Sequence, residues 1–154
     1  MKELKVQPIK NGTVIDHISP GQALKVLRIM GLPNGELRSV VSIAINVTSQ
    51  KTGTQKDVVK IEDREIDPRE VNKIALIAPK ATINIIRNFE VHKKQVVQLP
   101  KEVVGIVRCE NPSCITNSHE PVATRFTVVK KDPPQLRCAY CGREVRDVVG
   151  AVVD

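Results

Sequence analysis

The chain has 154 residues, enough for one ordinary domain or two small ones. Apolar residues make up 41% of it and allow a hydrophobic core, but aromatic residues are only 2%, so this core must be aliphatic. No segment has the apolar length of a signal peptide or of a membrane span, so we expect a soluble, cytoplasmic protein and not a secreted or membrane-embedded one.

The formal charge of +7 is concentrated in the first hundred residues. Residues 1–100 carry 16 Lys and Arg against 10 Asp and Glu, whereas residues 101–154 carry 8 against 7. An anionic partner would therefore bind the N-terminal part of the chain. A solubilising surface is the alternative explanation of the same charge.

The first half of the chain alternates predicted strands and helices. Residues 4–18 are typical of strands, and residues 19–31 have apolar side chains at helical spacing, with Ser19 as a candidate cap. Strict alternation of apolar and polar residues over 39–47 indicates a half-buried strand, and a second strand follows at 57–62.

The second predicted helix has the clearest start signal. Asp67 is a good N-cap, Pro68 suits the first helical position, and Glu70 completes a capping box. Pro79 ends the helix, and a β-branched strand is expected at 81–91. The order strand, helix, strand, strand, helix, strand predicts a split βαβ, ferredoxin-like antiparallel sheet with two helices on one face.

The character of the sequence changes at Pro100, where four cysteines and short valine-rich segments without a helical period begin. We expect strands there at 103–107, 126–129 and 145–149. The whole chain is therefore expected to be an α+β protein, with an N-terminal domain at 1–99 and a small all-β domain at 100–154. A piece of about 55 residues buries only a marginal core, and a bound metal is a common remedy.

The four cysteines form two close pairs, Cys109-x4-Cys114 and Cys138-x2-Cys141. Two such pairs on separate turns let four thiolates converge tetrahedrally on one Zn²⁺. Four sulfur ligands leave no open coordination position, so this zinc would be structural. A disulfide pair, a dithiol redox motif and an iron–sulfur cluster are the alternatives. His119, in the loop between the pairs, is surplus to a four-cysteine site.

Polar residues interrupt the apolar strands of the N-terminal part. Asp16 and His17 end the first strand, and Lys60 and Asn84 lie within later ones. On a sheet whose other face carries helices, such residues could form a polar pocket floor that reads a base or ribose by hydrogen bonding. Four lysines would supply phosphate-binding charge: Lys56, Lys60, Lys93 and Lys94. The alternative for each residue alone is a solvated side chain.

No catalytic set is recognisable, because the chain has neither a phosphate-cradling glycine loop nor an H-E-x-x-H motif. An enzyme in its own right is therefore disfavoured. A nucleic-acid-binding zinc-ribbon protein is the alternative class, suggested by the pI of about 9.4 and the four cysteines. The nearly neutral C-terminal part and the scarcity of aromatic residues count against it, so we expect no nucleic-acid partner.

Four segments and the cysteine spacing match one known family over essentially the whole chain. The segments are GTVIDHI at 12–18, KDVVKIE at 56–62, APKATIN at 78–84 and NFEV at 88–91. In these features the chain resembles the regulatory chain of aspartate carbamoyltransferase, the allosteric enzyme of pyrimidine biosynthesis. The resemblance implies a non-catalytic regulatory subunit with a nucleotide-binding allosteric domain and a zinc domain that contacts the catalytic chain.

The resemblance also implies effectors and partners. CTP would bind as a feedback inhibitor, ATP would compete as an activator, and UTP would act with CTP. The implied effector-binding residues are Ile9, Val14, Asp16, His17, Lys60, Asn84, Ile86, Phe89, Val91 and Lys94. One structural Zn²⁺ per chain is implied, and the expected contacts with the catalytic chain are Asn111, Tyr140 and Arg143. Regulatory chains would pair as homodimers through their N-terminal sheets within a dodecamer.

Overall fold

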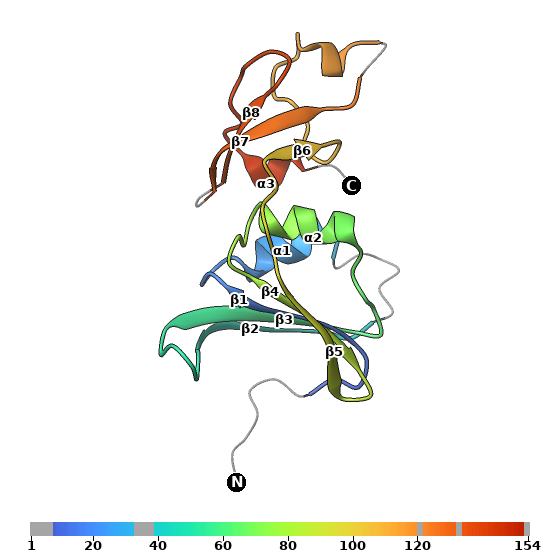
Figure 1. Cartoon of the computed structure of the whole chain (residues 1–154), viewed down its shortest axis with the longest axis vertical. Helices are drawn as coiled ribbons and strands as arrows, with labels where there is room; N and C mark the ends of the chain where they lie inside the picture. The colour runs from blue at the N-terminus through green and yellow to red at the C-terminus, as the bar shows by residue number, and fades with distance from the viewer. Residues whose placement is uncertain (1–7, 33–38, 120–121, 132–133, 153–154) are drawn as a thin grey trace.

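The computed structural model describes residues 8–32, 39–119, 122–131 and 134–152. These residues form a five-stranded antiparallel sheet with two helices, and a smaller three-stranded sheet that carries the cysteines (Figure 1). The helices lie between the large sheet and the C-terminal part. The predicted α+β class is therefore confirmed.

The large sheet has the strand order β2-β3-β1-β4-β5, and every neighbouring pair is antiparallel. Its strands are β1 (Gly12–Ile18), β2 (Val41–Thr48), β3 (Gln55–Glu62), β4 (Thr82–Arg87) and β5 (Glu90–Val96). The single strand predicted at 81–91 was wrong. Asn88 and Phe89 adopt φ values of 53° and 65°, and this left-handed turn folds the chain back to form β5.

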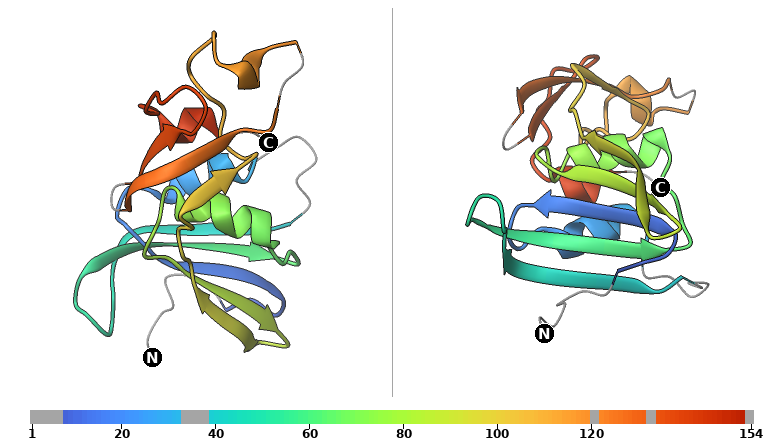
Figure 2. Two further views of the ribbon diagram at one scale, coloured as in Figure 1. Left: turned by 45° about the horizontal axis from the view of Figure 1, so that its top comes forward. Right: turned by 60° about the horizontal axis from the view of Figure 1, so that its bottom comes forward.

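The two helices, α1 (Ala23–Ile29) and α2 (Pro68–Ala75), cover one face of this sheet (Figure 2). The predicted capping box of α2 is present: Glu70 N donates to Asp67 Oδ1 at 2.9 Å, and Asp67 N donates to Glu70 Oε1 at 3.3 Å. The predicted cap Ser19 was wrong, because α1 begins at Ala23, whose N–H donates to Asp57 Oδ2 on the neighbouring strand at 3.0 Å.

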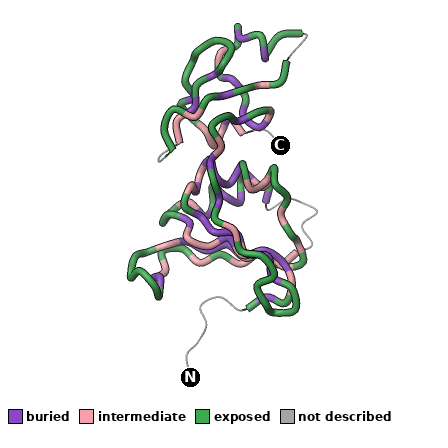
Figure 3. Tube along the Cα trace, in the orientation of Figure 1, coloured by how far each residue is buried: buried purple, intermediate pink, exposed green. Residues whose placement is uncertain are grey.

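The core between sheet and helices is aliphatic, as the composition required. Its fully buried members include Ile15, Ile18, Val26, Val59 and Ile74. Buried segments gather where the helices meet the sheet (Figure 3). Phe126 in the C-terminal part is the one aromatic side chain buried among the residues that the structure describes.

The C-terminal sheet has the order β6-β7-β8, with β6 (Glu102–Val104), β7 (Arg125–Lys131) and β8 (Pro134–Cys138). The strand predicted at 145–149 was wrong. A short helix, α3 (Val148–Ala151), begins there instead, and Gly150 N donates to Asp147 Oδ1 at 3.0 Å at its start. A single turn capped by one Asp has no periodicity that a sequence pattern could reveal.

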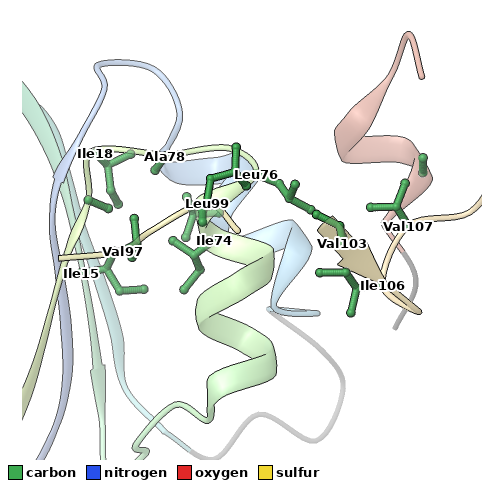
Figure 4. Packing of buried hydrophobic residues seen from close by; sticks show 14 of the residues in the cluster. Ile15, Ile18, Ile74, Leu76, Ala78, Val97, Leu99, Val103, Ile106 and Val107 are labelled. Carbon is green, nitrogen blue, oxygen red and sulfur yellow. The ribbon is translucent and has the colours of Figure 1, made fainter. Parts of the chain in front are cut away.

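The two parts share one hydrophobic core. Side chains at the end of α2 and in the segment after β5 pack toward those around β6 (Figure 4). The buried residues at this boundary are Leu76, Leu99, Val103, Ile106 and Val107. Arg69 on α2 also donates to the carbonyl of Gly105 at 3.2 Å. The C-terminal part is therefore packed against the helix layer and is not merely tethered to it.

Candidate metal centre and polar pocket

The four cysteines predicted as metal ligands converge. Their sulfur atoms all lie within 4.8 Å of one another, with Cys109 and Cys141 separated by 3.6 Å and Cys114 and Cys138 by 3.7 Å. Zinc–sulfur bonds of about 2.3 Å in a tetrahedron require sulfur atoms about 3.8 Å apart. The donor set and its spacing therefore fit a structural Zn²⁺, and the geometry leaves none of the four sulfurs outside the cluster.

Backbone and side-chain donors support these sulfurs. The N–H of Arg143 lowers the pKa of Cys141 to about 7. Burial opposes ionisation of Cys114, but the Thr116 hydroxyl, which donates to Cys114 Sγ at 3.3 Å, the Thr116 N–H and the neighbouring thiols together outweigh it, so the pKa of that thiol is lowered. Burial raises the pKa of Cys109 to about 12. A cation among the four sulfurs favours the thiolate form of each.

Tight loops hold the first cysteine pair in place. Asn111 Oδ1 accepts from Ser113 N at 3.0 Å, and the Asn111 carbonyl accepts from Cys114 N at 3.0 Å. Asn117 Nδ2 donates to the carbonyls of Cys109 and Asn111 at 3.0 and 2.8 Å. Asn111, predicted as a partner contact, therefore helps to shape the metal loop.

The other C-terminal residues singled out from the sequence are on the surface. Tyr140, directly before the last cysteine, is 49% exposed, and Arg143, two residues after it, is exposed. Ile115, which the sequence did not single out, begins a short 3-10 turn after Cys114 and is 53% exposed. His119 is exposed and lies outside the cysteine cluster, as expected for a residue that is surplus to the site.

A row of side chains crosses the face of the large sheet that the helices leave uncovered. The register pairs Ser42 with Lys60, Lys60 with Val14, Val14 with Asn84, and Asn84 with Lys94. Because strand side chains alternate between faces, this row faces away from α1 and α2. Val14, Lys60, Asn84 and Lys94, which were predicted as effector-binding residues and come from four separate segments, thus lie side by side on this face.

A cavity of about 230 Å³, here named the polar pocket, lies along this face near the ends of β1 and β2. It is lined by Asp16, His17, Thr48, Ser49, Gln50, Lys51, Lys56, Thr82, Asn84 and Lys94. The sequence did not identify Thr48 to Lys51 or Thr82. Thr48 ends β2 and Ser49 to Lys51 begin the polar turn after it, and only the strand register brings these residues beside β1 and β4.

A β-bulge lets two consecutive residues line the polar pocket. Ile15 pairs with Val59 and Ile18 with Asp57, so β1 carries one extra residue against β3. His17 accordingly adopts a left-handed φ of 57°, and both Asp16 and His17 reach the same pocket. In a regular strand these neighbours would point to opposite faces.

The polar pocket is electrostatically organised around Asp16. Lys56 Nζ lies 2.8 Å from Asp16 Oδ1, and His17 N donates to Oδ1 at 2.7 Å. Partial burial opposes the charge, but these two donors hold the pKa of Asp16 below its ordinary value. Partial burial also lowers the pKa of Lys60, against the attraction of Asp16. The pocket presents cations and hydroxyls, the groups that bind phosphate oxygens.

The remaining predicted effector residues lie around this face. Ile9 and Ile86 are buried, whereas Phe89, at the turn between β4 and β5, and Val91, near the start of β5, are 66% and 57% exposed. Lys93 was assigned to the phosphate-binding charge, and this was wrong. It pairs with Ile85, a core residue, so its side chain lies on the helix-covered face.

Among the described residues, no helix is long and apolar enough to cross a membrane.

Two family models match the chain. Residues 4–98 match the allosteric domain of the aspartate carbamoyltransferase regulatory chain, and residues 101–148 match the metal-binding domain of the same family. Each model covers one of the two sheets described above.

Curated relatives agree over nearly the full length. The chain is 54% identical to the aspartate carbamoyltransferase regulatory chain of Methanothrix thermoacetophila over 95% of this chain and 94% of that protein. It is 57% identical to the regulatory chain of Methanothermobacter thermautotrophicus, over 92% and 88% of the two chains. Identity to the regulatory chain of Methanocella arvoryzae is 60%, over 91% and 89%.

The fold, the cysteine cluster and these matches define a non-catalytic regulatory chain with an allosteric part and a metal-binding part. The chain belongs to the aspartate carbamoyltransferase regulatory chain family. The resemblance seen in the sequence, and the expectation of a regulatory chain in place of an enzyme, are both confirmed.

Proposed function

We propose that this chain binds nucleoside triphosphates in its polar pocket and transmits their effect to catalytic chains of aspartate carbamoyltransferase. The observation that carries the proposal is the row of Lys60, Val14, Asn84 and Lys94 on the uncovered face of the sheet, beside a pocket rich in cations and hydroxyls. Asp16, Lys60 and Asn84 offer acceptors and donors for a base or ribose, and Lys94 offers charge for the triphosphate.

The effectors follow from the family and from the chemistry of this pocket. CTP is the proposed inhibitor, ATP competes for the same site as an activator, and UTP acts together with CTP. Ile9 and Ile86 supply apolar contact below the nucleotide, while Phe89 and Val91 are exposed and free to pack against a base. His17, with Nδ1 at 3.3 Å from Thr82 Oγ1, lies where a phosphate oxygen would meet both side chains.

The proposed division of labour is an allosteric domain at 1–99 and a zinc-binding domain at 100–154. The two separate sheets and the family models ending at residue 98 and beginning at residue 101 support this boundary. The zinc domain would dock onto the catalytic chain through the loops around the cysteines, where Tyr140, Arg143 and Ile115 are exposed. Asn111 would act there by shaping the loop.

Membership in the family implies association with catalytic chains. We propose further that two copies of this chain pair through β2 and that the pairs are built into a dodecamer with catalytic chains. The uncharged edge strand VSIAINVT, with Ile45 47% exposed, supports such pairing. We assign the assembly to the cytoplasm, which is supported by four cysteines arranged as metal ligands and not as disulfides.

Calorimetry with CTP tests the nucleotide proposal. Lys94→Ala and Lys60→Ala should each weaken binding by about 1.5–3 kcal/mol, because each removes a charge-assisted contact. Lys25→Ala, an exposed lysine on the opposite side of the sheet, is the matched control and should bind CTP as the unchanged chain does. Equal CTP affinity in all three variants would exclude the polar pocket as the nucleotide site.

A further inference from the structure

Asp57 is a fully buried carboxylate that accepts hydrogen bonds from Gly21, Ala23 and Asn46, and none of these three residues is proposed to bind the nucleotide. It lies on β3 between Lys56, which lines the polar pocket, and Val58. Because side chains alternate along a strand, Lys56 and Asp57 point to opposite faces of the sheet. Asp57 therefore faces the helix layer beneath the pocket.

Three backbone N–H groups, two from the segment that begins α1 and one from β2, converge on this one carboxylate. Asn46 N donates to Oδ1 at 2.8 Å, while Gly21 N and Ala23 N donate to Oδ2 at 2.8 and 3.0 Å. These donors belong to β2, to the turn after β1 and to the first residue of α1. A single side chain on β3 thus ties the turn before α1 and the first residue of α1 to β2.

Both strands that flank β3 bulge beside Asp57. In β1 the extra residue lies between Ile15 and Ile18, and Ile18 pairs with Asp57. In β2 the extra residue lies between Ala44 and Val47, directly opposite Asp57. Each bulge contains a non-glycine residue with a left-handed φ, His17 at 57° and Asn46 at 59°. Such conformations persist only where the surroundings hold them in place.

The two bulges lead directly into the walls of the polar pocket. The β1 bulge contains Asp16 and His17, and the β2 bulge comes just before Thr48 and the turn that follows it. The position of both walls therefore depends on backbone that Asp57 holds. This dependence would be absent if Asp57 served only to cap α1.

We propose that Asp57 is a positioning residue of the polar pocket, which sets the spacing of its two walls by holding the β2 bulge and the turn after β1. The inference rests on the proposed nucleotide-binding function of that pocket. According to this inference, the buried Asp57 side chain affects the affinity for the nucleotide although it lies on the opposite face of the sheet.

Asp57→Asn tests the role in the full-length, zinc-loaded chain. The amide keeps one acceptor oxygen but turns an NH₂ group toward N–H donors, so at least one of the three hydrogen bonds is lost. We expect CTP affinity by calorimetry to fall roughly three- to tenfold. Amide hydrogen exchange should accelerate at Asn46, Gly21 and Ala23, while exchange within β4 stays slow.

Val59→Ala is the matched control, since Val59 is fully buried on the same face of β3 and has no polar role. It should lower the melting temperature at least as much as Asp57→Asn and change CTP affinity by less than about twofold. Wild-type affinity in Asp57→Asn, or an equal loss of affinity in Val59→Ala, would overturn the proposal.

A measurement on the unchanged chain covers the case in which Asp57→Asn does not fold. CTP should slow exchange of the Asn46 and Gly21 amides, although neither residue lines the polar pocket. Unchanged exchange at both amides with CTP bound would overturn the role of Asp57 alone. A wild-type chain that binds no CTP would overturn this role and the proposed function together.

Discussion

Asp16 shows how one residue acquires its properties from the strands around it. The sequence indicated only a carboxylate at a strand end. The fold adds Lys56 from β3 and the His17 N–H from the bulge, and together these lower the pKa of Asp16 against the opposing effect of burial. An ionised Asp16 beside a lysine is ready to accept hydrogen bonds from a sugar hydroxyl.

The lowered pKa of Asp16 predicts a pH dependence. The folded-state pKa lies below the ordinary value of 3.8, so the charged carboxylate stabilises the fold at neutral pH. This stabilisation declines as the pH falls below about 4 and is lost once the pH passes the lowered pKa. Lys56→Met should raise the pKa of Asp16, measured by NMR titration of its carboxyl carbon. Lys25→Met is the control, and an unchanged Asp16 titration in Lys56→Met would contradict the assignment.

Among the elements, the two edge strands of the large sheet differ in composition. β5 carries Glu90, His92, Lys93 and Lys94, charges of the kind that discourage strand addition at an edge. β2, at the other edge, has no charged residue and exposes part of Ile43 and Ile45. This contrast favours β2 as the edge at which a second copy continues the sheet.

A charge placed on the β2 edge should therefore prevent pairing. Ile43→Lys is expected to convert a dimer of the chain into monomers in sedimentation velocity, because the lysine would be buried without a partner at the new strand pair. His92→Lys, on the β5 edge, should leave the dimer intact. Dimers that persist in Ile43→Lys, or monomers in His92→Lys, would argue against pairing through β2.

Across the whole molecule, the zinc-stabilised loops are linked to the helix layer. Glu110, beside the first cysteine, accepts from the N–H groups of Arg146 and Asp147 at 3.0 and 3.1 Å, which anchors the segment leading into α3. Ala151 of α3 and Val107 belong to the core that continues to α2. Metal binding is therefore coupled to the packing at the boundary of the two parts.

Zinc removal with a chelator should affect the C-terminal sheet strongly and the five-stranded sheet only weakly. The C-terminal sheet should lose amide protection, because four thiolates hold its loops together. The five-stranded sheet should stay folded, since Ile15, Val59 and Ile74 form a core without metal. Its melting temperature should nevertheless drop by several degrees, because the packing contacts with the C-terminal part are lost. Unfolding of both sheets on chelation, or no change in either, would contradict this prediction. Added Zn²⁺, but not Mg²⁺, should restore the amide protection of the C-terminal sheet.

The sequence alone was sufficient wherever the physics is local or carried by a short motif. The capping box of α2, the aliphatic core and the cysteine pairs depend on a few residues at fixed spacing, and all three are as predicted. The placement of Lys60 and Asn84 on one face of the sheet could also be predicted, because side chains alternate between the two faces along each strand.

Tertiary structure alone decided which distant residues meet. The fifth strand, the bulges at His17 and Asn46 and the capping of α1 by Asp57 all arise from strand register and from hydrogen bonds between segments far apart in the chain. A local pattern carries no information on such partners, because left-handed turns and buried N–H groups are stabilised by neighbours that the sequence does not place nearby. The walls of the polar pocket, unlike its floor, are therefore a product of the fold.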